Sequence, residues 1–194
     1  MDTSIESLLN ELESFGLEND ITVKEDSPKM KNITKDTGQF LSLLIKNSKV
    51  KNVLEIGTSN GYSTIWIAKN FINSDAHVTT VEIDDRKIVM ARANFRRANL
   101  EKYVTSHHED AGAFLKRQAN ETFDFIFLDS DRSHYIDWWE DLNRVLQRNS
   151  LMIVDNANSH REEVADFIKL IQSSESHDSL IVSVGKGVFI IHKN

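Results

Sequence analysis

The segment 53–63, which reads Val-Leu-Glu-Ile-Gly-Thr-Ser-Asn-Gly-Tyr-Ser, constrains the fold more than any other part of the chain. An apolar strand is followed by a turn with glycines at Gly57 and Gly61, and a helix begins directly after it. A second apolar run ends at Glu82, which places a carboxylate at the tip of the next predicted strand. In an open α/β sheet, this arrangement holds a nucleoside-containing cofactor at the carboxyl edge of the strands.

The spacing of the two glycines argues against a dinucleotide cofactor. The pattern is Glu-x-Gly-x-x-x-Gly, whereas a pyrophosphate needs three glycines so that backbone N–H groups can approach it at a helix N-terminus. At this segment the chain resembles the class I S-adenosylmethionine-dependent methyltransferases, whose cofactor carries no phosphate. A looser turn with polar side chains is sufficient for such a cofactor, so a nicotinamide dehydrogenase ranks last among the interpretations.

Composition restricts the class of protein and its partners. The chain has 194 residues, enough for one domain with a full core, and it has no cysteine for disulfides or thiolate metal sites. The net charge of −7 argues against a nucleic-acid partner. No apolar run approaches the ~20 residues needed to cross a bilayer, and the N-terminal residues do not resemble a signal peptide. We therefore expect a cytoplasmic protein without a membrane partner.

The N-terminal region differs from the rest of the chain. Apolar residues at helical spacing predict a helix over 3–15, and the polar segment 18–35 is predicted to be irregular. We therefore divide the chain into an N-terminal helix and extension, 1–35, and one domain, 36–194. The apolar face of the first helix suits its own domain or a second subunit, and the sequence leaves both open. That face consists of Ile5, Leu8, Leu9 and Leu12.

Strands and helices alternate through the rest of the chain. Strands are predicted at 50–57, 77–83, 104–108, 123–128 and 151–154, with helices at 62–71, 85–98, 110–117, 133–147 and 161–172. Two last strands, 180–184 and 188–192, are joined by a tight turn at Gly185-Lys186-Gly187 and form an antiparallel hairpin. The pattern predicts an α/β fold with a mostly parallel sheet and a C-terminal antiparallel β-hairpin. This resembles the seven-stranded sheet of the class I methyltransferases, and the resemblance implies their three-layer, Rossmann-like methyltransferase fold. A Rossmann dehydrogenase lacks this hairpin.

Three polar residues near the glycine turn are candidates for cofactor binding. Glu82, at the end of its strand, is placed to accept both hydroxyls of a ribose, and a solvated strand end is the competing interpretation. Glu55 lies inside an apolar strand, where an unpaired carboxylate would be costly. Ser63 lies one turn into the following helix, where contact with the carboxylate of the cofactor and a plain helical serine are both open.

A second group of polar residues follows two later strands. Asp129 and Asp131 come after the strand 123–128, and Asp155 and Asn156 come after the strand 151–154. If these strands are neighbours, about 4.8 Å apart, Asp129, Asp155 and Asn156 converge at one sheet edge. Carboxylate and amide oxygens suit Mg²⁺ or Mn²⁺. Ordinary strand ends are the competing interpretation, and spacing alone does not decide between them.

The residues around these aspartates narrow the resemblance. The runs Phe-Leu-Asp-Ser-Asp-Arg-x-x-Tyr at 127–135, Val-Asp-Asn at 154–156 and Gly-Gln-Phe-Leu at 38–41 resemble the cation-dependent O-methyltransferases. This family contains the catechol and caffeoyl-coenzyme A O-methyltransferases, and the similarity covers about residues 30–194. It implies a homodimer, a small-molecule acceptor, and Mg²⁺ or another divalent cation held by Asp129, Asp155 and Asn156. It also implies an S-adenosylmethionine pocket formed by Ile33 or Thr34, Glu55, Gly57, Thr58, Gly61, Ser63, Glu82, Ala111, Asp129 and Asp131.

The chain departs from the family at Arg132. Much of the family has a lysine there, three residues after the first metal aspartate, which assists as a base. A guanidinium cannot accept a proton at neutral pH, so Arg132 is expected to stabilise a phenolate instead. His134 and His160 follow the two metal segments and are the alternative bases. We take Arg132 and His134 as the catalytic candidates.

These observations predict an S-adenosylmethionine-dependent O-methyltransferase, assisted by a divalent metal, that acts on a small phenolic, catechol-like or other hydroxyl acceptor. One alternative is a metal-independent methyltransferase of the same fold, in which Asp129 and Asp155 are structural. The other is a noncatalytic cofactor-binding or interaction protein, for which Arg132 is the main support.

Overall fold

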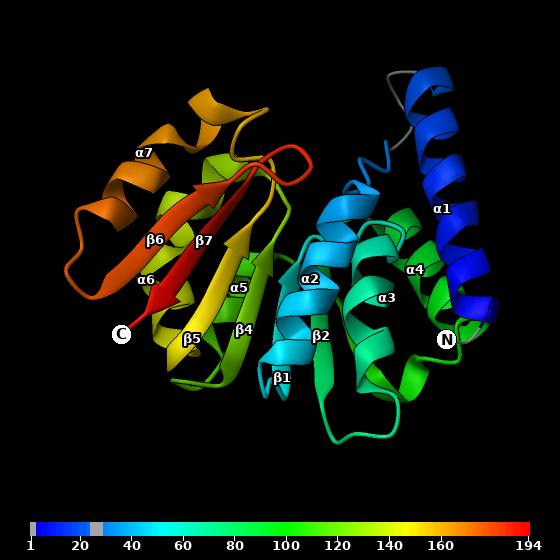
Figure 1. Cartoon of the computed structure of the whole chain (residues 1–194), viewed down its shortest axis with the longest axis horizontal. Coiled ribbons are helices and arrows are strands. Elements are labelled where there is room, and N and C mark those ends of the chain that lie inside the picture. The colour runs from blue at the N-terminus through cyan, green and yellow to red at the C-terminus, as the bar shows by residue number, and fades with distance from the viewer. Residues whose placement is uncertain (1–2, 24–28) are drawn as a thin grey trace.

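A seven-stranded sheet forms the centre of the computed structural model, which describes residues 3–23 and 29–194 (Figure 1). The strand order is β3-β2-β1-β4-β5-β7-β6. The strands are β1 (Asn52–Ile56), β2 (His77–Glu82), β3 (Val104–His108), β4 (Phe123–Leu128), β5 (Leu146–Val154), β6 (His177–Val182) and β7 (Val188–Lys193). Strand β7 pairs antiparallel with β5 and β6, while β1 to β5 pair in parallel. The predicted fold class is confirmed.

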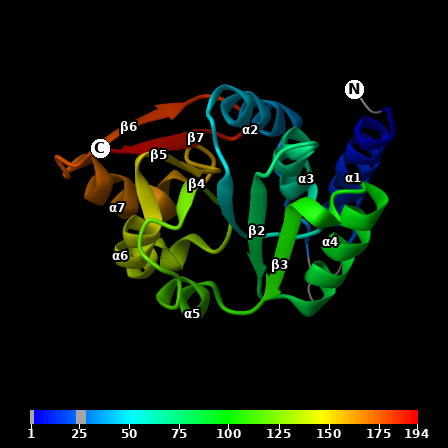
Figure 2. The ribbon, with the colours of Figure 1, turned by 90° about the horizontal axis from the view of Figure 1, so that it is seen from below.

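Helices cover both faces of this sheet, with α1 to α4 on one face and α5 to α7 on the other (Figure 2). The helices are α1 (Thr3–Thr22), α2 (Lys35–Asn47), α3 (Tyr62–Ala68), α4 (Asp85–Arg97), α5 (Ala111–Lys116), α6 (Tyr135–Val145) and α7 (Arg161–Gln172). Short 3₁₀ turns occur at Lys69–Phe71, Glu101–Tyr103 and Arg132–His134. The three layers therefore enclose two hydrophobic clusters, one on each side of the sheet.

Strand β1 shows why the central strands are apolar almost throughout. Val53 packs into the cluster on the side of α1 to α4, and Leu54 and Ile56 pack into the opposite cluster. Successive side chains of a strand point to opposite faces, so a strand covered on both faces is apolar at every position. Glu55 is the exception, since it is a buried residue with an ionisable side chain in this strand.

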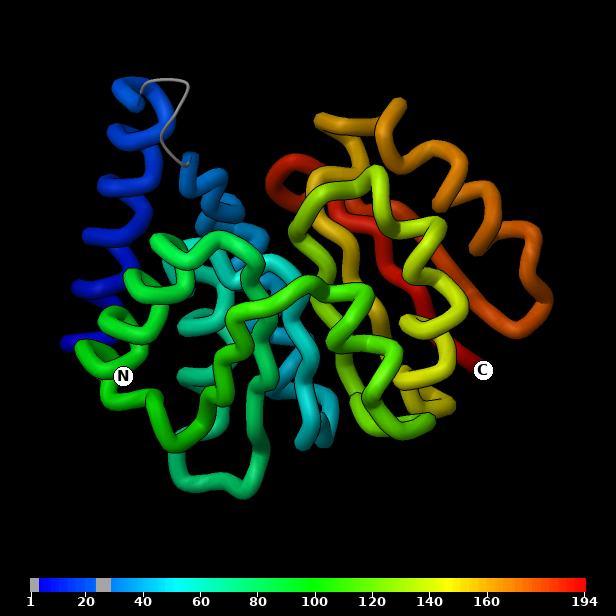
Figure 3. Tube along the Cα trace, turned by 180° about the vertical axis from the view of Figure 1, so that it is seen from behind, coloured from blue at the N-terminus to red at the C-terminus, as the bar shows by residue number. Residues whose placement is uncertain are grey.

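Helix α1 packs on its own domain. The four residues of its predicted apolar face, Ile5, Leu8, Leu9 and Leu12, are buried in the cluster that α2, α3 and α4 share. Figures 1 and 3 show α1 at one end of the molecule and α7 at the other. This settles the choice that the sequence left open for the apolar face, whereas the domain boundary at residue 35 stays a prediction.

Two predicted boundaries are wrong. The first helix continues to Thr22, so residues 18–22 are helical instead of irregular. The helix predicted over 133–147 ends at Val145, and β5 begins at Leu146 rather than at residue 151. Leu146 pairs with Phe123 of β4, so a contact between distant segments overrides the helical pattern of its neighbours.

Within residues 3–23 and 29–194, no helix is both long and apolar enough to span a bilayer. The cytoplasmic location and the homodimer stay predictions from the sequence.

Candidate functional site

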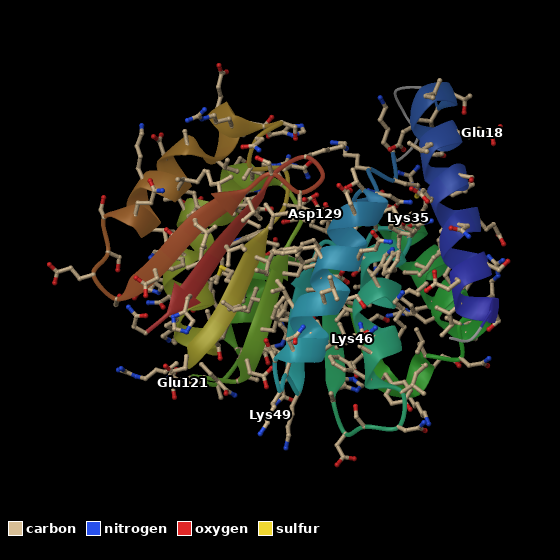
Figure 4. All side chains as sticks on the ribbon, viewed as in Figure 1. Glu18, Lys35, Lys46, Lys49, Glu121 and Asp129 are labelled. Carbon is tan, nitrogen blue, oxygen red and sulfur yellow. The ribbon has the colours of Figure 1, made fainter. Side chains whose placement is uncertain are left out.

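A cavity of about 480 Å³ lies at the carboxyl edge of β1, β2 and β4. Residues from several separate segments line it: Asp20, Met30, Lys31, Ile56, Gly57, Ser59, Val81, Glu82, Ile83, Lys87, Glu109, Asp110, Ala111, Asp129, Ser130, Asp131, Arg132, Trp138, Asn156, His160 and Lys186. Figure 4 shows Asp129 at this edge, with Lys49 and Glu121 at the opposite edge. The cavity is therefore where an open α/β sheet is expected to hold a ligand.

The turn after β1 brings two sides of the cavity together. Gly57 has a φ of +102°, and a Cβ at this position would lie 2.0 Å from the carbonyl oxygen of Asp129. Gly61 has a φ of +86°, and its Cβ would lie 2.6 Å from the ring of Phe95. Both positions therefore require glycine. The Asp129 N–H donates to the carbonyl of Ile56 at 3.0 Å, so the chain after β4 stays joined to β1 at the cavity.

Backbone donors orient the carboxylate of Glu82 on the cavity wall. Its Oε1 accepts the N–H groups of Ile83 and Asp84, each at 2.9 Å. Its Oε2 accepts the N–H of Ser59, in the glycine turn, at 2.8 Å. A carboxylate fixed in this way keeps acceptor capacity for a hydroxyl donor in the cavity.

Glu55 is satisfied inside the protein by hydroxyl groups. The hydroxyls of Ser63 and Thr80 donate to it at 2.6 Å, and Thr64 also donates. Burial raises the pKa of Glu55 to about 7, against the opposite effect of these hydroxyls. The contacts join β1, β2 and α3 directly beneath the glycine turn. Here Glu55 and Ser63 bind each other and lie outside the cavity lining.

Asp129, Asp155 and Asn156 come together as the sequence suggests. Leu128 pairs with Val154 in the parallel ladder, so the two aspartates follow paired residues. The Asn156 Nδ2 donates to Asp129 Oδ1 at 3.2 Å and to Asp155 Oδ2 at 3.1 Å. Burial raises the pKa of both carboxyls, and the charge of Asp129 raises that of Asp155 further.

This cluster has the chemistry of a divalent cation site. Asp155 Oδ1 is buried, and it has no hydrogen-bond partner among residues 3–23 and 29–194. A cation would satisfy that oxygen and offset the repulsion of two buried carboxylates. The amide oxygen of Asn156, which accepts from the Ser159 hydroxyl at 3.2 Å, would have to change places with the amide nitrogen to join the set. No group of three or more His, Cys, Asp or Glu side chains suits a metal in the described residues, so the site depends on this mixed set.

Arg132, His134 and His160, the candidates for a general base or for stabilising a phenolate, differ in their position relative to the cavity. Arg132 lines the cavity, donates from Nη1 to Glu163 at 3.3 Å, and has a buried Nε without a partner in the described part of the chain. His134 is exposed and stacks on Trp138, with ring centroids 5.2 Å apart, outside the cavity lining. His160 lines the cavity, and burial, aided by the charge of Arg132, lowers its pKa.

The cavity lining includes half of the residues that the sequence nominated. Those on the lining are Gly57, Glu82, Ala111, Asp129, Asp131, Arg132, Asn156 and His160. Those outside it are Ile33, Thr34, Glu55, Thr58, Gly61, Ser63, His134 and Asp155. Ile33 is buried in the core, and Met30 and Lys31 occupy the neighbouring stretch of the wall. The individual binding and catalytic roles stay predictions.

Sequence reasoning missed several lining residues that come from other segments. Asp20, near the end of α1, accepts the N–H groups of Met30 and Lys31 at 2.6 and 2.7 Å and so positions that part of the wall. Trp138 lies in the helix predicted over 133–147, and Lys186 lies in the predicted hairpin turn. Their helical and turn signals are local, and nothing in either signal shows that they face this edge of the sheet.

The sequence matches the protein-family model described as O-methyltransferase over residues 3–193. The chain belongs to this O-methyltransferase family. It is 32% identical over 127 residues to the catechol O-methyltransferase of Niastella koreensis, covering 64% of this chain and 57% of that protein. It is 32% identical over 124 residues to the catechol O-methyltransferase of Mycobacterium tuberculosis, covering 64% and 56%. The family resemblance drawn from the motifs is confirmed.

A solved structure of the O-methyltransferase from Bacillus cereus in complex with S-adenosylhomocysteine is also similar. The TM-score is 0.80 at 25% identity, with 96% of this chain and 91% of that chain covered. The fold shared with that structure therefore extends over nearly the whole chain. The sequence match to the two catechol O-methyltransferases, in contrast, spans little more than half of their length.

Proposed function

We propose that this protein is an S-adenosylmethionine-dependent O-methyltransferase that acts on a hydroxyl group of a small phenolic or catechol-like acceptor. The observation that carries the proposal is that Glu82 and the pair formed by Asp129 and Asn156 lie on one cavity at the carboxyl edge. Similarity to two catechol O-methyltransferases and to a structure that contains S-adenosylhomocysteine supports it.

The proposed cofactor site lies at the part of the cavity wall that follows β2. Glu82, already oriented by three backbone N–H groups, accepts the ribose hydroxyls. Ile83, Ala111 and Trp138 supply apolar surface beside it for the adenine. S-adenosylmethionine supplies a methyl group on a sulfonium, and the chain's main task is to hold that methyl in line with the acceptor oxygen.

The proposed metal site uses the donor set after β4 and β5. Asp129, Asp155 and Asn156 hold Mg²⁺ or another divalent cation, which favours the ionised form of an acceptor hydroxyl. Arg132 adds a permanent positive charge to the same cavity and stabilises a phenolate without taking its proton.

The test is transfer of labelled methyl from S-adenosylmethionine to a panel of catechols with Mg²⁺ present. We expect turnover that a chelator abolishes and that Asp155→Ala loses. Turnover that survives the chelator would support the metal-independent alternative. Cofactor binding without turnover of any acceptor would support a noncatalytic binding protein, and thermal stabilisation by NAD would contradict the assignment altogether.

A further inference from the structure

The turn between β6 and β7 carries a basic residue on the cavity wall that the proposed mechanism does not use. Lys186 lies between Gly185 and Gly187 and lines the cavity. Its side chain is exposed and makes no ion pair or hydrogen bond within the part of the chain that the structure describes. An unpaired cation beside a ligand cavity is available to bind a ligand.

The backbone of this turn is held in place on two sides. Three hydrogen bonds of 2.8 to 3.1 Å join the turn to the segment 157–159, directly after the metal candidate Asn156. On the other side, the Gly185 N–H donates to Asp36, at the start of α2, at 2.9 Å. Lys186 is therefore anchored beside the loop that carries the proposed metal ligands, although it is distant from them in sequence.

Arg132 supplies a second cation from the connection after β4. Among the described residues, its side chain donates one hydrogen bond, from Nη1 to Glu163, and its buried Nε has no partner. The positive charges of Lys186 and Arg132 both lower the pKa of Asp129, Asp155 and His160. Two cations from separate elements thus act on the same part of the cavity.

Other carboxylates of the wall are engaged by their own segments. Glu109 pairs with Arg117, and Asp110 caps α5 by accepting the Ala113 N–H at 2.8 Å. Asp131 similarly accepts the N–H of the nearby Ser133, at 3.1 Å. These groups hold local structure and give Lys186 no direct counter-charge.

Backbone N–H groups bind the wall carboxylates Asp20 and Glu82, which leaves the acid pair formed by Asp129 and Asp155. A divalent cation held by Asp129 and Asp155 would offset their two negative charges. Among the described residues, Lys186 and Arg132 would then have only Glu163 as a directly bonded carboxylate. A cation in a partly desolvated cavity is stabilised by an anion, and a carboxylate binds a guanidinium or ammonium through charge-assisted hydrogen bonds.

We propose that Lys186, with the positive charge of Arg132 in the same part of the cavity, binds a carboxylate on the acceptor, so that the protein prefers phenolic acids to neutral catechols. This inference rests on the proposed methyl transfer, because it concerns the acceptor of that reaction. The carboxylate binds at the hairpin side of the cavity, and the hydroxyls face the acid pair.

The experiment compares 3,4-dihydroxybenzoate with catechol by their ratio of kcat/KM. The wild-type ratio favours the acid, and Lys186→Gln lowers this ratio by about tenfold, the size expected for one charge-assisted hydrogen bond. Lys186→Arg, which keeps the charge, restores most of the ratio. The matched control is Lys49→Gln, an exposed lysine at the opposite edge of the sheet (Figure 4), and it keeps the wild-type ratio.

Calorimetric titration of both acceptors into protein loaded with S-adenosylhomocysteine and Mg²⁺ gives a second readout. If catechols are methylated but Lys186→Gln keeps the wild-type ratio, the subsite is wrong and the proposed function stands. If no acceptor is methylated, tighter binding of the acid that Lys186→Gln weakens would support the subsite while the proposed function fails. Equal binding of acid and catechol, or equal binding by wild type and variant, overturns the subsite. Circular dichroism confirms that each variant is folded.

Discussion

The carboxylates on the β1–β2 side of the sheet edge differ from those on the β4–β5 side in how their oxygens are satisfied. Glu55 and Glu82 each use both oxygens to accept hydrogen bonds from hydroxyls or backbone N–H groups. Asp129 and Asp155 share a single amide donor, and one oxygen of Asp155 has no partner in the described residues. The protein thus supplies hydrogen-bond donors for the carboxylates of the first side and leaves those of the second side short of donors, which is the condition that favours binding of a cation.

The largest expected effect is at Gly57, where the two sides meet. Gly57→Ala places a methyl group against the Asp129 carbonyl in a left-handed backbone, so we expect a loss of about 3–5 kcal/mol in the free energy of unfolding. Denaturant titration measures it. Gly16→Ala is the control, because the nearest atoms to the added methyl there belong to the Asn32 side chain and not to the backbone. Equal stability of the two variants would contradict the close approach at Gly57.

Removal of the Glu82 side chain should weaken cofactor binding on the β1–β2 side and leave Mg²⁺ binding by Asp129 and Asp155 unchanged. Glu82→Ala leaves the ribose without its acceptor, and we expect the dissociation constant of S-adenosylhomocysteine to rise by about 100-fold. Isothermal titration calorimetry measures this constant. The Mg²⁺-dependent stabilisation should persist in the variant, since the acid pair is intact. Wild-type affinity in Glu82→Ala would remove Glu82 from the cofactor site.

Mg²⁺ should stabilise the protein through the carboxylates on the β4–β5 side of the sheet edge and not through those on the β1–β2 side. Saturation with Mg²⁺ at about 100 times its dissociation constant should stabilise the wild type by about 2.7 kcal/mol. Asp155→Asn should abolish this effect, and without metal it should be more stable than the wild type because one buried charge is gone. Thermal unfolding measures both, with Glu55→Gln as the control that keeps the Mg²⁺ effect. An Mg²⁺ effect in Asp155→Asn equal to that of the wild type would contradict the site.

The smallest expected effect concerns the pH dependence that Glu55 contributes. The pKa of Glu55 is raised from 4.5 to about 7 by folding, so its contribution to stability is fully present below pH 4.5 and is lost as the pH rises through 7. Glu55→Gln should flatten the stability profile over this window by about 1–3 kcal/mol. Unfolding curves of both proteins across this range measure the difference. Parallel profiles would show that Glu55 has an ordinary pKa.

Much of the fold and part of the site were predictable from local patterns. Apolar runs, their alternation with helical periodicity and the glycine turn predicted the order of strands and helices and the terminal hairpin. Asp129, Asp155 and Asn156 were predicted to converge because residues after parallel strands share one edge, and the ladder between β4 and β5 brings them together. These features depend on short-range periodicity and on a general rule of sheet geometry, both of which a sequence displays.

Only the tertiary structure decided which side chains face the cavity and which are buried and hydrogen-bonded to other residues of the protein. Glu55 accepts a hydrogen bond from Thr80 of the neighbouring strand. Backbone hydrogen bonds between the hairpin turn and the segment 157–159 place Lys186 at the cavity. The start of β5 at Leu146 likewise depends on its pairing with Phe123. Each of these contacts joins segments that lie far apart along the chain, and local propensity carries no information about such pairings.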